Sequence, residues 1–318
     1  MRKIILFLLD LASFILTPLV AGIAALQSKM GAERFPFTFK MWDAFGVSPI
    51  RHHYYQPVFN VNHLPEEVWE HADPLLGINL NIEKQLSLLS SFIYQKELAD
   101  IPIGKSSNAS SIFYHNNPMF GPADAEILYN VVRHFKPTRV IEIGAGYSTR
   151  LVKIALDINR NEGVAAKHSC IEPYENPWLS ELGIDEIIRE RVEDVNLVKF
   201  DELKKNDILF IDSSHVLRTG GDVFTEYLHI IPKLNPGVLV HIHDIFLPYE
   251  YPQKWIVNER RFWTEQYLLQ AFLAFNSDFE VLLSVNYLAK HYPNELSGAC
   301  PVFGRLRKGH GSFWIRRK

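Results

Sequence analysis

Cysteine is scarce in this sequence, since only Cys170 and Cys300 occur among 318 residues. Two cysteines make neither a disulfide framework nor a zinc cluster. Cys170 lies in a run that predicts a buried strand, where a free thiol behaves as a small hydrophobe. The sequence therefore indicates a reducing compartment.

An excess of positive charge is also lacking. The 33 lysines and arginines are outnumbered by 36 aspartates and glutamates, which leaves a net charge of −3. No basic stripe runs through the middle of the chain, so nucleic acid is excluded as an expected partner. Internal repeats are missing too, which excludes a solenoid, whereas a hydrophobic content of 47% is that of a folded globular protein.

One long apolar run is present, over residues 4–26, directly after Arg2 and Lys3. Its length would just span a bilayer, but Asp10 within it would cost about 2.5–3.5 kcal/mol in lipid. Three interpretations stay open. They are a membrane-associated helix, preferably one that lies on the surface or is re-entrant; a helix packed on the domain or on a dimer partner; and a cleaved secretory signal.

Composition divides the rest of the chain in two. Residues 31–120 are rich in aromatics, prolines and histidines without a lasting periodicity, which predicts an irregular cap with short helices, the clearest over 82–98. From residue 121 onward, apolar runs of strand length alternate with helical patterns. The sequence thus predicts a hydrophobic helix over 1–30, a cap over 31–120 and a doubly wound α/β domain over 121–318.

Strands and helices are expected to alternate along the α/β domain. Strands are predicted at 140–143, 167–172, 187–192, 207–212, 237–244, 279–288 and 312–316, and helices at 124–135, 148–159, 221–231 and 259–275.

The domain is organised around residues 139–150, where an apolar, β-branched run contains Glu142 and leads into Gly144-Ala145-Gly146. Glycines let the chain turn sharply and bring its backbone close to a ligand, and Ser148 or Thr149 can cap the helix that follows. The third glycine of the dinucleotide fingerprint is replaced by Thr149. A carboxylate at Glu142 would repel a pyrophosphate, but it suits a cationic ligand.

Acidic side chains and histidines recur at four predicted strand ends. They are Glu142, Glu172, Asp212 with His215, and His243 with Asp244. In a doubly wound sheet ligands bind at the carboxyl ends of the strands. Because like charges on one rim repel, stability does not account for this set, and we expect a binding site there.

The stretch Glu142-Ile143-Gly144-Ala145-Gly146-Tyr147-Ser148-Thr149 resembles motif I of the class I S-adenosylmethionine-dependent methyltransferases. Together with Ile211-Asp212-Ser213-Ser214-His215 and His243-Asp244, it is most similar to methyltransferase family 24 and to metal-dependent sugar O-methyltransferases, over about residues 121–318. The resemblance implies a Rossmann-like, seven-stranded, mostly parallel sheet and S-adenosylmethionine as cofactor. The residues that it assigns to the cofactor are Glu142, Gly144, Ala145, Gly146, Tyr147, Ser148, Glu172, Asp194 and Asp212.

The resemblance also implies a metal and a base. Asp212 and Asp244 would hold Mg²⁺ or a similar hard cation together with His243, which stands where an acid is usual. His215 would act as the general base, with Asp212 beside it. A hydroxyl loses its proton poorly at neutral pH, so a histidine that titrates near neutrality suits this role, and a divalent ion would lower the hydroxyl's pKa further.

The candidates for an aromatic wall against a sugar or another flat acceptor are Tyr249, Tyr251, Trp255 and the helix start Trp263-Thr264-Glu265-Gln266-Tyr267. The expected activity is O-methylation of a glycan or small molecule by a cytoplasmic protein, peripheral to the inner face of the membrane, with a membrane-linked acceptor and a homo-oligomeric state left open. Two other classes stay open. One is a nicotinamide-dependent oxidoreductase, against which Thr149 counts, and the other is a non-catalytic scaffold that would not need His215.

Overall fold

The computed structural model describes residues 2–105, 112–174 and 176–318. The chain divides into two compact units, one of Met1–Glu66 with Ile256–Phe262 and one of Glu67–Trp255 with Trp263–Lys318. Residues 67–120, expected to belong to a cap, are part of the unit that contains the sheet. The change of composition at residue 120 therefore does not mark the division between the units.

The first unit contains two helices, α1 (Arg2–Met30) and α2 (Pro36–Ala44), and a 3₁₀ turn at Val61–His63. α1 covers the whole apolar run in one helix, in which Pro18 lies inside. The indole Nε1 of Trp42 in α2 donates to Oε1 of Gln27 in α1 over 2.8 Å, and this bond joins the two helices.

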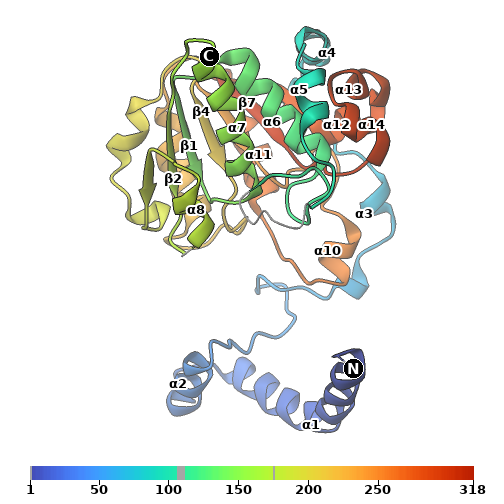
Figure 1. Ribbon diagram of the computed structural model, residues 1–318. Helices are drawn as coiled ribbons and strands as arrows, with labels where there is room; N and C mark the ends of the chain where they lie inside the picture. The colour runs from blue at the N-terminus through green and yellow to red at the C-terminus, as the bar shows by residue number, and fades with distance from the viewer. Residues whose placement is uncertain (1, 106–111, 175) are drawn as a thin grey trace. The chain divides into compact units, whose positions relative to one another are not determined.

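The second unit is built on one sheet of seven strands (Figure 1), in the order β3-β2-β1-β4-β5-β7-β6. The strands are β1 (Arg139–Ile143), β2 (Lys167–Ile171), β3 (Glu186–Ile188), β4 (Ile208–Ile211), β5 (Leu239–Ile242), β6 (Phe279–Ser284) and β7 (Phe313–Arg317). β1 to β5 are parallel, whereas β7 runs antiparallel to both β5 and β6. The expected doubly wound sheet with one antiparallel strand is confirmed.

Helices lie on both faces of this sheet (Figure 1). One face is covered by α6, α7 and the C-terminal helices, which share a core with Val140 and Phe210. The other face is covered by α9, the segment after it and α11, which pack with Ile141, Ile143 and Ile211. The helices of this unit are α3 (Glu67–Glu70), α4 (Ile82–Ser91), α5 (Gln95–Asp100), α6 (Pro122–Phe135), α7 (Tyr147–Asn161), α8 (Pro177–Glu181), α9 (Asp222–Thr225), α11 (Glu265–Leu273), α12 (Val285–His291), α13 (Pro293–Ala299) and α14 (Pro301–Leu306), and α10 (Gln253–Val257) crosses the division between the units.

The helix predicted over 82–98 is two helices, α4 and α5. The hydroxyls of Ser90 and Ser91 donate to main-chain carbonyls one turn earlier, over 2.8 and 2.7 Å. Serine side chains that bond in this way compete with the helical hydrogen bonds. The next residue, Phe92, takes an extended backbone and ends α4.

The helix predicted over 221–231 is also interrupted. α9 ends at Thr225, and a π-helical turn (Glu226–Ile230) and a 3₁₀ turn (Ile231–Lys233) follow. Pro232 explains this change, because proline lacks an N–H and its ring clashes with the carbonyl four residues earlier in an α-helix.

The strand predicted over 279–288 ends at Ser284, where α12 begins. The amide of Ser284 donates to Gln85 Oε1 over 2.8 Å, and its hydroxyl donates to the carbonyl of Leu247 over 3.0 Å. These bonds to distant segments take the chain out of the strand ladder. Nothing in the apolar pattern of 279–288 could reveal them.

Candidate active site

The glycine loop lies between β1 and α7, at the carboxyl edge of the parallel strands. Gly144 has a φ of +86°, and a Cβ on it would lie 2.1 Å from the main-chain oxygen of Asp212. Glycine is therefore required there both for backbone conformation and for the close approach of β1 and β4. Around Gly146 an added Cβ would meet no atom within 4 Å, so space is open above that residue.

Glu142 does not reach this open space, because its carboxylate is fully buried beneath the loop. Its Oε2 accepts from the hydroxyls of Ser148 and Thr149, each over 3.2 Å, and its Oε1 contacts the Nε2 of His168. The thiol of Cys170 lies 3.9 Å from the same oxygen. Glu142 thus holds the first turn of α7 against β1 and β2.

A cavity of about 240 Å³ opens at the ends of β1, β2 and β4. Gly144, Glu172 and Asp212 all line it, as expected for a ligand site at this rim. Oε2 of Glu172 accepts from the amide of Ala145 over 3.0 Å, which ties the loop to the end of β2. Of the acids predicted at strand ends, Glu172 and Asp212 are therefore brought together in this cavity, whereas Glu142 is not.

Three further predicted cofactor residues lie differently. Asp194 pairs with Arg191 over 2.8 Å, and its neighbour Glu193 lines the cavity. Ser148 is buried and turned toward Glu142. The hydroxyl of Tyr147 lies 3.3 Å from that of Tyr114.

Two carboxylates and two imidazoles converge beside this cavity. Oδ1 of Asp212 lies 3.4 Å from Nε2 of His215 and 3.4 Å from Nδ1 of His243. Asp244 faces the same two nitrogens, with Oδ2 at 3.8 Å from His215 and Oδ1 at 3.7 Å from His243. Each separation exceeds an ordinary hydrogen bond, so each of these four distances is longer than that of a tight pair.

Two buried carboxylates hold the imidazoles from behind. Oε2 of Glu265 lies 2.8 Å from Nδ1 of His215, and its Oε1 accepts from Tyr227 over 3.1 Å. Oδ2 of Asp124 lies 3.7 Å from Nε2 of His243. Neither acid is recognisable from the sequence as the partner of a histidine, because each lies in the first turn of a helix, where the helix dipole alone makes acids common.

These contacts shift the ionisation of the whole cluster. Burial alone would lower the pKa of His215, but the carboxylates of Asp212 and Glu265 outweigh burial and raise it to about 10. Burial alone would raise the pKa of Asp212, but His243 and His215 hold it well below its usual value. Burial raises the pKa of Asp244, against the opposing effect of both imidazoles. Negative charge at this site is thus balanced by protonated imidazoles.

The backbone is strained at the same place. His215 and Asp244 have φ values of +61° and +56°, in the left-handed region that side chains disfavour. Such residues cost about 1–3 kcal/mol each and cluster at functional sites. The carbonyl of His215 accepts the amides of Thr264 and Glu265 over 2.9 and 3.1 Å, which holds the turn in place.

Aromatic side chains flank the cluster. The ring centroid of Trp263 lies 4.2 Å from that of His215, and the ring centroid of Trp255 lies 5.2 Å from that of Trp263. Of the residues expected to form a wall, Trp263 and Trp255 are thus near the cluster. Tyr251 is buried, and its hydroxyl accepts from the amide of Gln266 over 3.0 Å, whereas Tyr249 stacks against His291.

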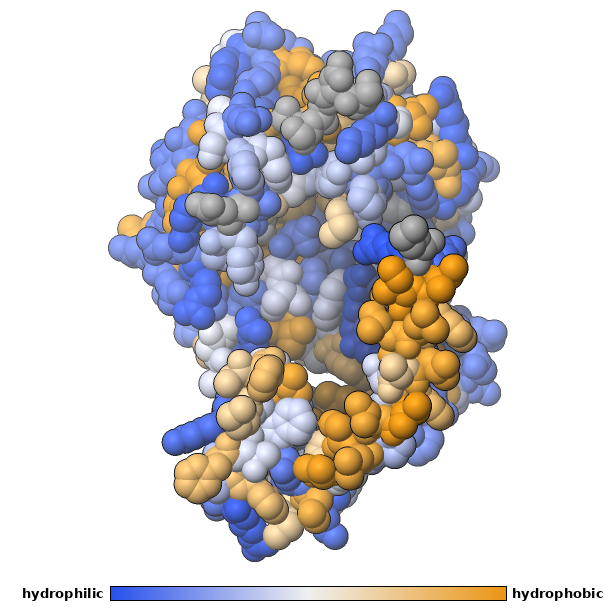
Figure 2. Space-filling model, turned by 60° about the horizontal axis from the view of Figure 1, so that its bottom comes forward, coloured by the Kyte–Doolittle hydropathy of each residue, from blue (hydrophilic) through white to orange (hydrophobic). Residues whose placement is uncertain are grey.

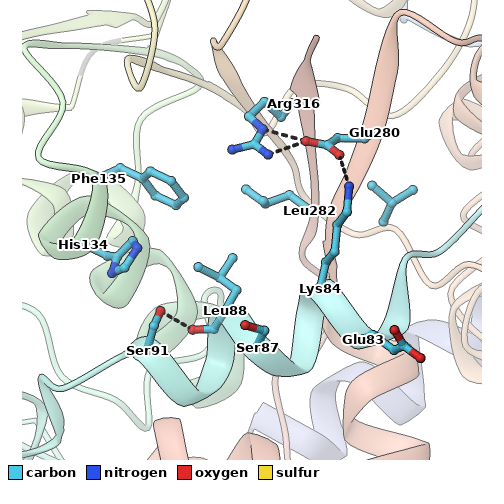
Figure 3. A pocket seen from close by; sticks show the side chains of 11 residues that line it. Glu83, Lys84, Ser87, Leu88, Ser91, His134, Phe135, Glu280, Leu282 and Arg316 are labelled. Carbon is cyan, nitrogen blue, oxygen red and sulfur yellow. Dashed lines mark hydrogen bonds and ion pairs between the residues drawn. The ribbon is translucent and has the colours of Figure 1, made fainter.

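A separate pocket of about 510 Å³ lies between α4, the end of α6, β6 and β7 (Figure 3). Glu280 within it is paired with Lys84 over 3.1 Å and with Arg316. Arg316 is opposite Leu239, the first residue of β5, so this pocket is at the amino edge of the parallel strands. It is remote from the acidic rim.

A family model and a relative match part of this chain. A methyltransferase-domain family model matches residues 141–245, which include the glycine loop and both aspartates of the cluster. An uncharacterized protein of Archaeoglobus fulgidus is 32% identical over 169 residues, which make up 49% of this chain and 74% of that protein.

Two solved structures are more distant. The O-methyltransferase TomG of Streptomyces achromogenes, involved in tomaymycin synthesis and solved with S-adenosylmethionine, is 17% identical, with 72% of this chain and 88% of that chain covered and a TM-score of 0.37. An O-methyltransferase of Bacillus cereus, in complex with S-adenosylhomocysteine, is 14% identical, with 73% and 91% covered and a TM-score of 0.37. A likeness of this degree does not identify a substrate.

The sheet order with its single antiparallel strand, the glycine loop after β1 and the domain match over that loop point to one family. The chain belongs to the class I S-adenosylmethionine-dependent methyltransferases.

Proposed function

We propose that this protein methylates a hydroxyl oxygen of a sugar, a glycan or another small molecule. The observation that carries the proposal is the Glu265–His215 pair, whose Nε2 faces Asp212 at the edge of the cofactor cavity. A carboxylate on Nδ1 orients an imidazole so that Nε2 can accept a proton. Nε2 must first release the proton that Asp212 and Glu265 favour on this ring. The hydroxyl then gives its proton to Nε2, its oxygen bonds to the methyl carbon, and the carbon–sulfur bond breaks to leave S-adenosylhomocysteine.

We propose that S-adenosylmethionine occupies the cavity above the glycine loop. Gly144, Ala145 and Gly146 would let the backbone approach it, and Glu172 would accept hydrogen bonds from the ribose hydroxyls. Glu193 is better placed than Asp194 for a polar contact, since it lines the cavity. Glu142 would act from beneath, because it holds Ser148 and the start of α7.

The donor set also supports a divalent cation, to be held by Asp212, Asp244 and His243. The carboxylates face imidazole nitrogens at 3.4–3.8 Å, and a cation there would balance the same negative charge as the protonated rings. With an imidazole among the ligands, these residues fit a first-row transition ion better than Mg²⁺, which prefers oxygen. Such an ion lowers the pKa of a hydroxyl that it touches.

The acceptor class rests on the aromatic rings beside His215. Trp263 lies against His215 and Trp255 lies against Trp263, so apolar rings stand beside the base, which suits the partly apolar face of a sugar ring. We further propose that α1 associates with the inner face of a membrane and that the acceptor is linked to lipid. In support, the side chains of α1 are exposed along residues 4–26, with the single acid Asp10 among them.

Calorimetry with S-adenosylmethionine and S-adenosylhomocysteine tests cofactor binding. Mass spectrometry of an extract fraction for a 14-dalton gain, the mass of an added CH₂, tests methyl transfer. His215→Ala should lower the rate of methyl transfer by about 10²–10⁴-fold with cofactor affinity retained. His229→Ala, at an exposed histidine, is the matched control. A protein that binds neither compound and binds NADH would refute the proposal in favour of an oxidoreductase.

A further inference from the structure

The exposed apolar surface of the first unit continues beyond α1. Phe37, Met41 and Phe45 have 84%, 58% and 77% of their surface exposed. They are four residues apart along α2 and its C-cap, so they lie on one side of that helix. This stripe is a second apolar surface, additional to α1. Figure 2 shows exposed apolar side chains gathered on one part of the face in view, which is otherwise largely hydrophilic.

α2 has three distinct sides. The side of Trp42 faces α1, through the bond from its Nε1 to Gln27. Lys40 and Asp43 are exposed on another side, and the Phe37 stripe lies between these two. A helix with an apolar stripe beside a charged one, and no apolar core of its own, is typical of segments that lie in a membrane–water interface.

The place at which α2 joins α1 agrees with a position of α2 at the membrane–water interface. The apolar run of α1 ends at Leu26, and Gln27, Ser28 and Lys29 follow. Trp42 contacts Gln27 over 2.8 Å, and the amide of Arg51 donates to Ser28 over 3.1 Å. α2 is therefore attached at the level where polar residues begin, and tryptophan is enriched at this level of a bilayer.

We propose that α2 lies in the interface of the membrane that receives α1, with Phe37, Met41 and Phe45 toward the acyl chains and Lys40 and Asp43 toward water. The occupant of the stripe is a lipid surface. A protein partner would cover one stripe of α1, whereas the apolar side chains of α1 are exposed on most of its circumference. The proposal rests on the membrane association of α1 put forward above.

The test uses the full chain in vesicles of phosphatidylcholine with a minority of phosphatidylglycerol. An environment-sensitive fluorophore is attached to Phe37→Cys, to Asp43→Cys and, as the matched control, to Phe275→Cys, since Phe275 in the second unit is also 84% exposed. Cys170 and Cys300 are buried and do not compete for the label. Quenching is measured with aqueous iodide and with a nitroxide carried on the lipid chains.

We expect the protein to float with the vesicles, and the label at 37 to lose iodide quenching and gain lipid quenching. The labels at 43 and 275 should stay accessible to iodide. If the protein floats but the label at 37 behaves like that at 275, α2 does not lie in the interface, and the proposal for α1 stands. If the chain stays at the bottom of a density gradient in which the vesicles float, or the mass of the protein from cells shows cleavage within residues 1–30, the proposals for α1 and for α2 both fall.

Discussion

The contact between the glycine loop and the end of β4 predicts that Gly144→Ala is far more damaging than Gly146→Ala. The two glycines are two residues apart in one loop, so composition, exposure and helix propensity hardly distinguish them. Only Gly144 combines a φ of +86° with a main-chain oxygen 2.1 Å from the position of an added Cβ.

The expected magnitude has two parts. A left-handed backbone costs an alanine about 1–2 kcal/mol, and overpacking of a well-packed site costs typically about 1–3 kcal/mol. The atom in the way is the backbone oxygen of Asp212, which cannot rotate aside as a side chain would. We expect Gly144→Ala to lower the free energy of unfolding by about 3 kcal/mol, which lowers Tm by roughly 6–12 °C for a domain of this size.

The assay is denaturant unfolding followed by circular dichroism, with calorimetric titration of S-adenosylmethionine beside it. Gly146→Ala should change the free energy of unfolding by less than about 1 kcal/mol, because its Cβ meets open space. It should nevertheless weaken cofactor binding, since the methyl group occupies the space proposed for the ligand. Equal stability of the two variants would refute the steric argument, and unchanged cofactor affinity in Gly146→Ala would refute the placement of the ligand.

Three other predictions follow from buried charges. Burial raises the pKa of Glu126 to about 7 despite two main-chain amides that donate to its carboxylate, so its contribution to stability is full below about pH 4.5 and about 3 kcal/mol is lost as the pH rises through 7. The free energy of unfolding of Glu126→Gln should therefore vary less between pH 5 and 8 than that of the native protein, and parallel pH profiles of the two proteins would contradict this. Glu265→Gln should lower the rate of methyl transfer by about 10–100-fold, because His215 loses the carboxylate that orients it, while calorimetry shows unchanged cofactor affinity. A rate equal to that of the native protein would exclude a role of Glu265 in the mechanism. Arg133, whose side chain is 2% exposed, pairs with two glutamates, so Arg133→Met should lower the free energy of unfolding by about 2–4 kcal/mol. The control Arg191→Met, at a side chain that is 62% exposed, should lower it by less than about 1 kcal/mol, and similar losses in both variants would contradict the argument from burial.

The rim of the site was predictable because it depends on local rules. A β-branched run, an acid and two glycines define a strand and the turn after it within a few residues. Parallel strands place their carboxyl ends at one edge whatever the rest of the chain does. The sequence alone therefore assigns Glu172, Asp212 and Asp244 to one edge of the sheet.

The carboxylates behind the imidazoles were not predictable in this way. Glu265 is 50 residues from His215 in the chain, and Asp124 is far from His243. Both look like ordinary acids of a first helical turn. The choice between Asp194 and Glu193 was equally open, because Arg191 pairs with both acids and only the fold places Glu193 in the lining of the cavity.

The amino-acid sequence alone determined the doubly wound sheet, the glycine turn and the acidic rim, since period, strand ends and turn residues act over a few positions. Only the tertiary structure decided where β6 ends, which carboxylates orient the two histidines, and that Glu142 is buried while Gly146 is open. These outcomes depend on hydrogen bonds and burial between segments tens to hundreds of residues apart, and such distances leave no periodic trace in a sequence.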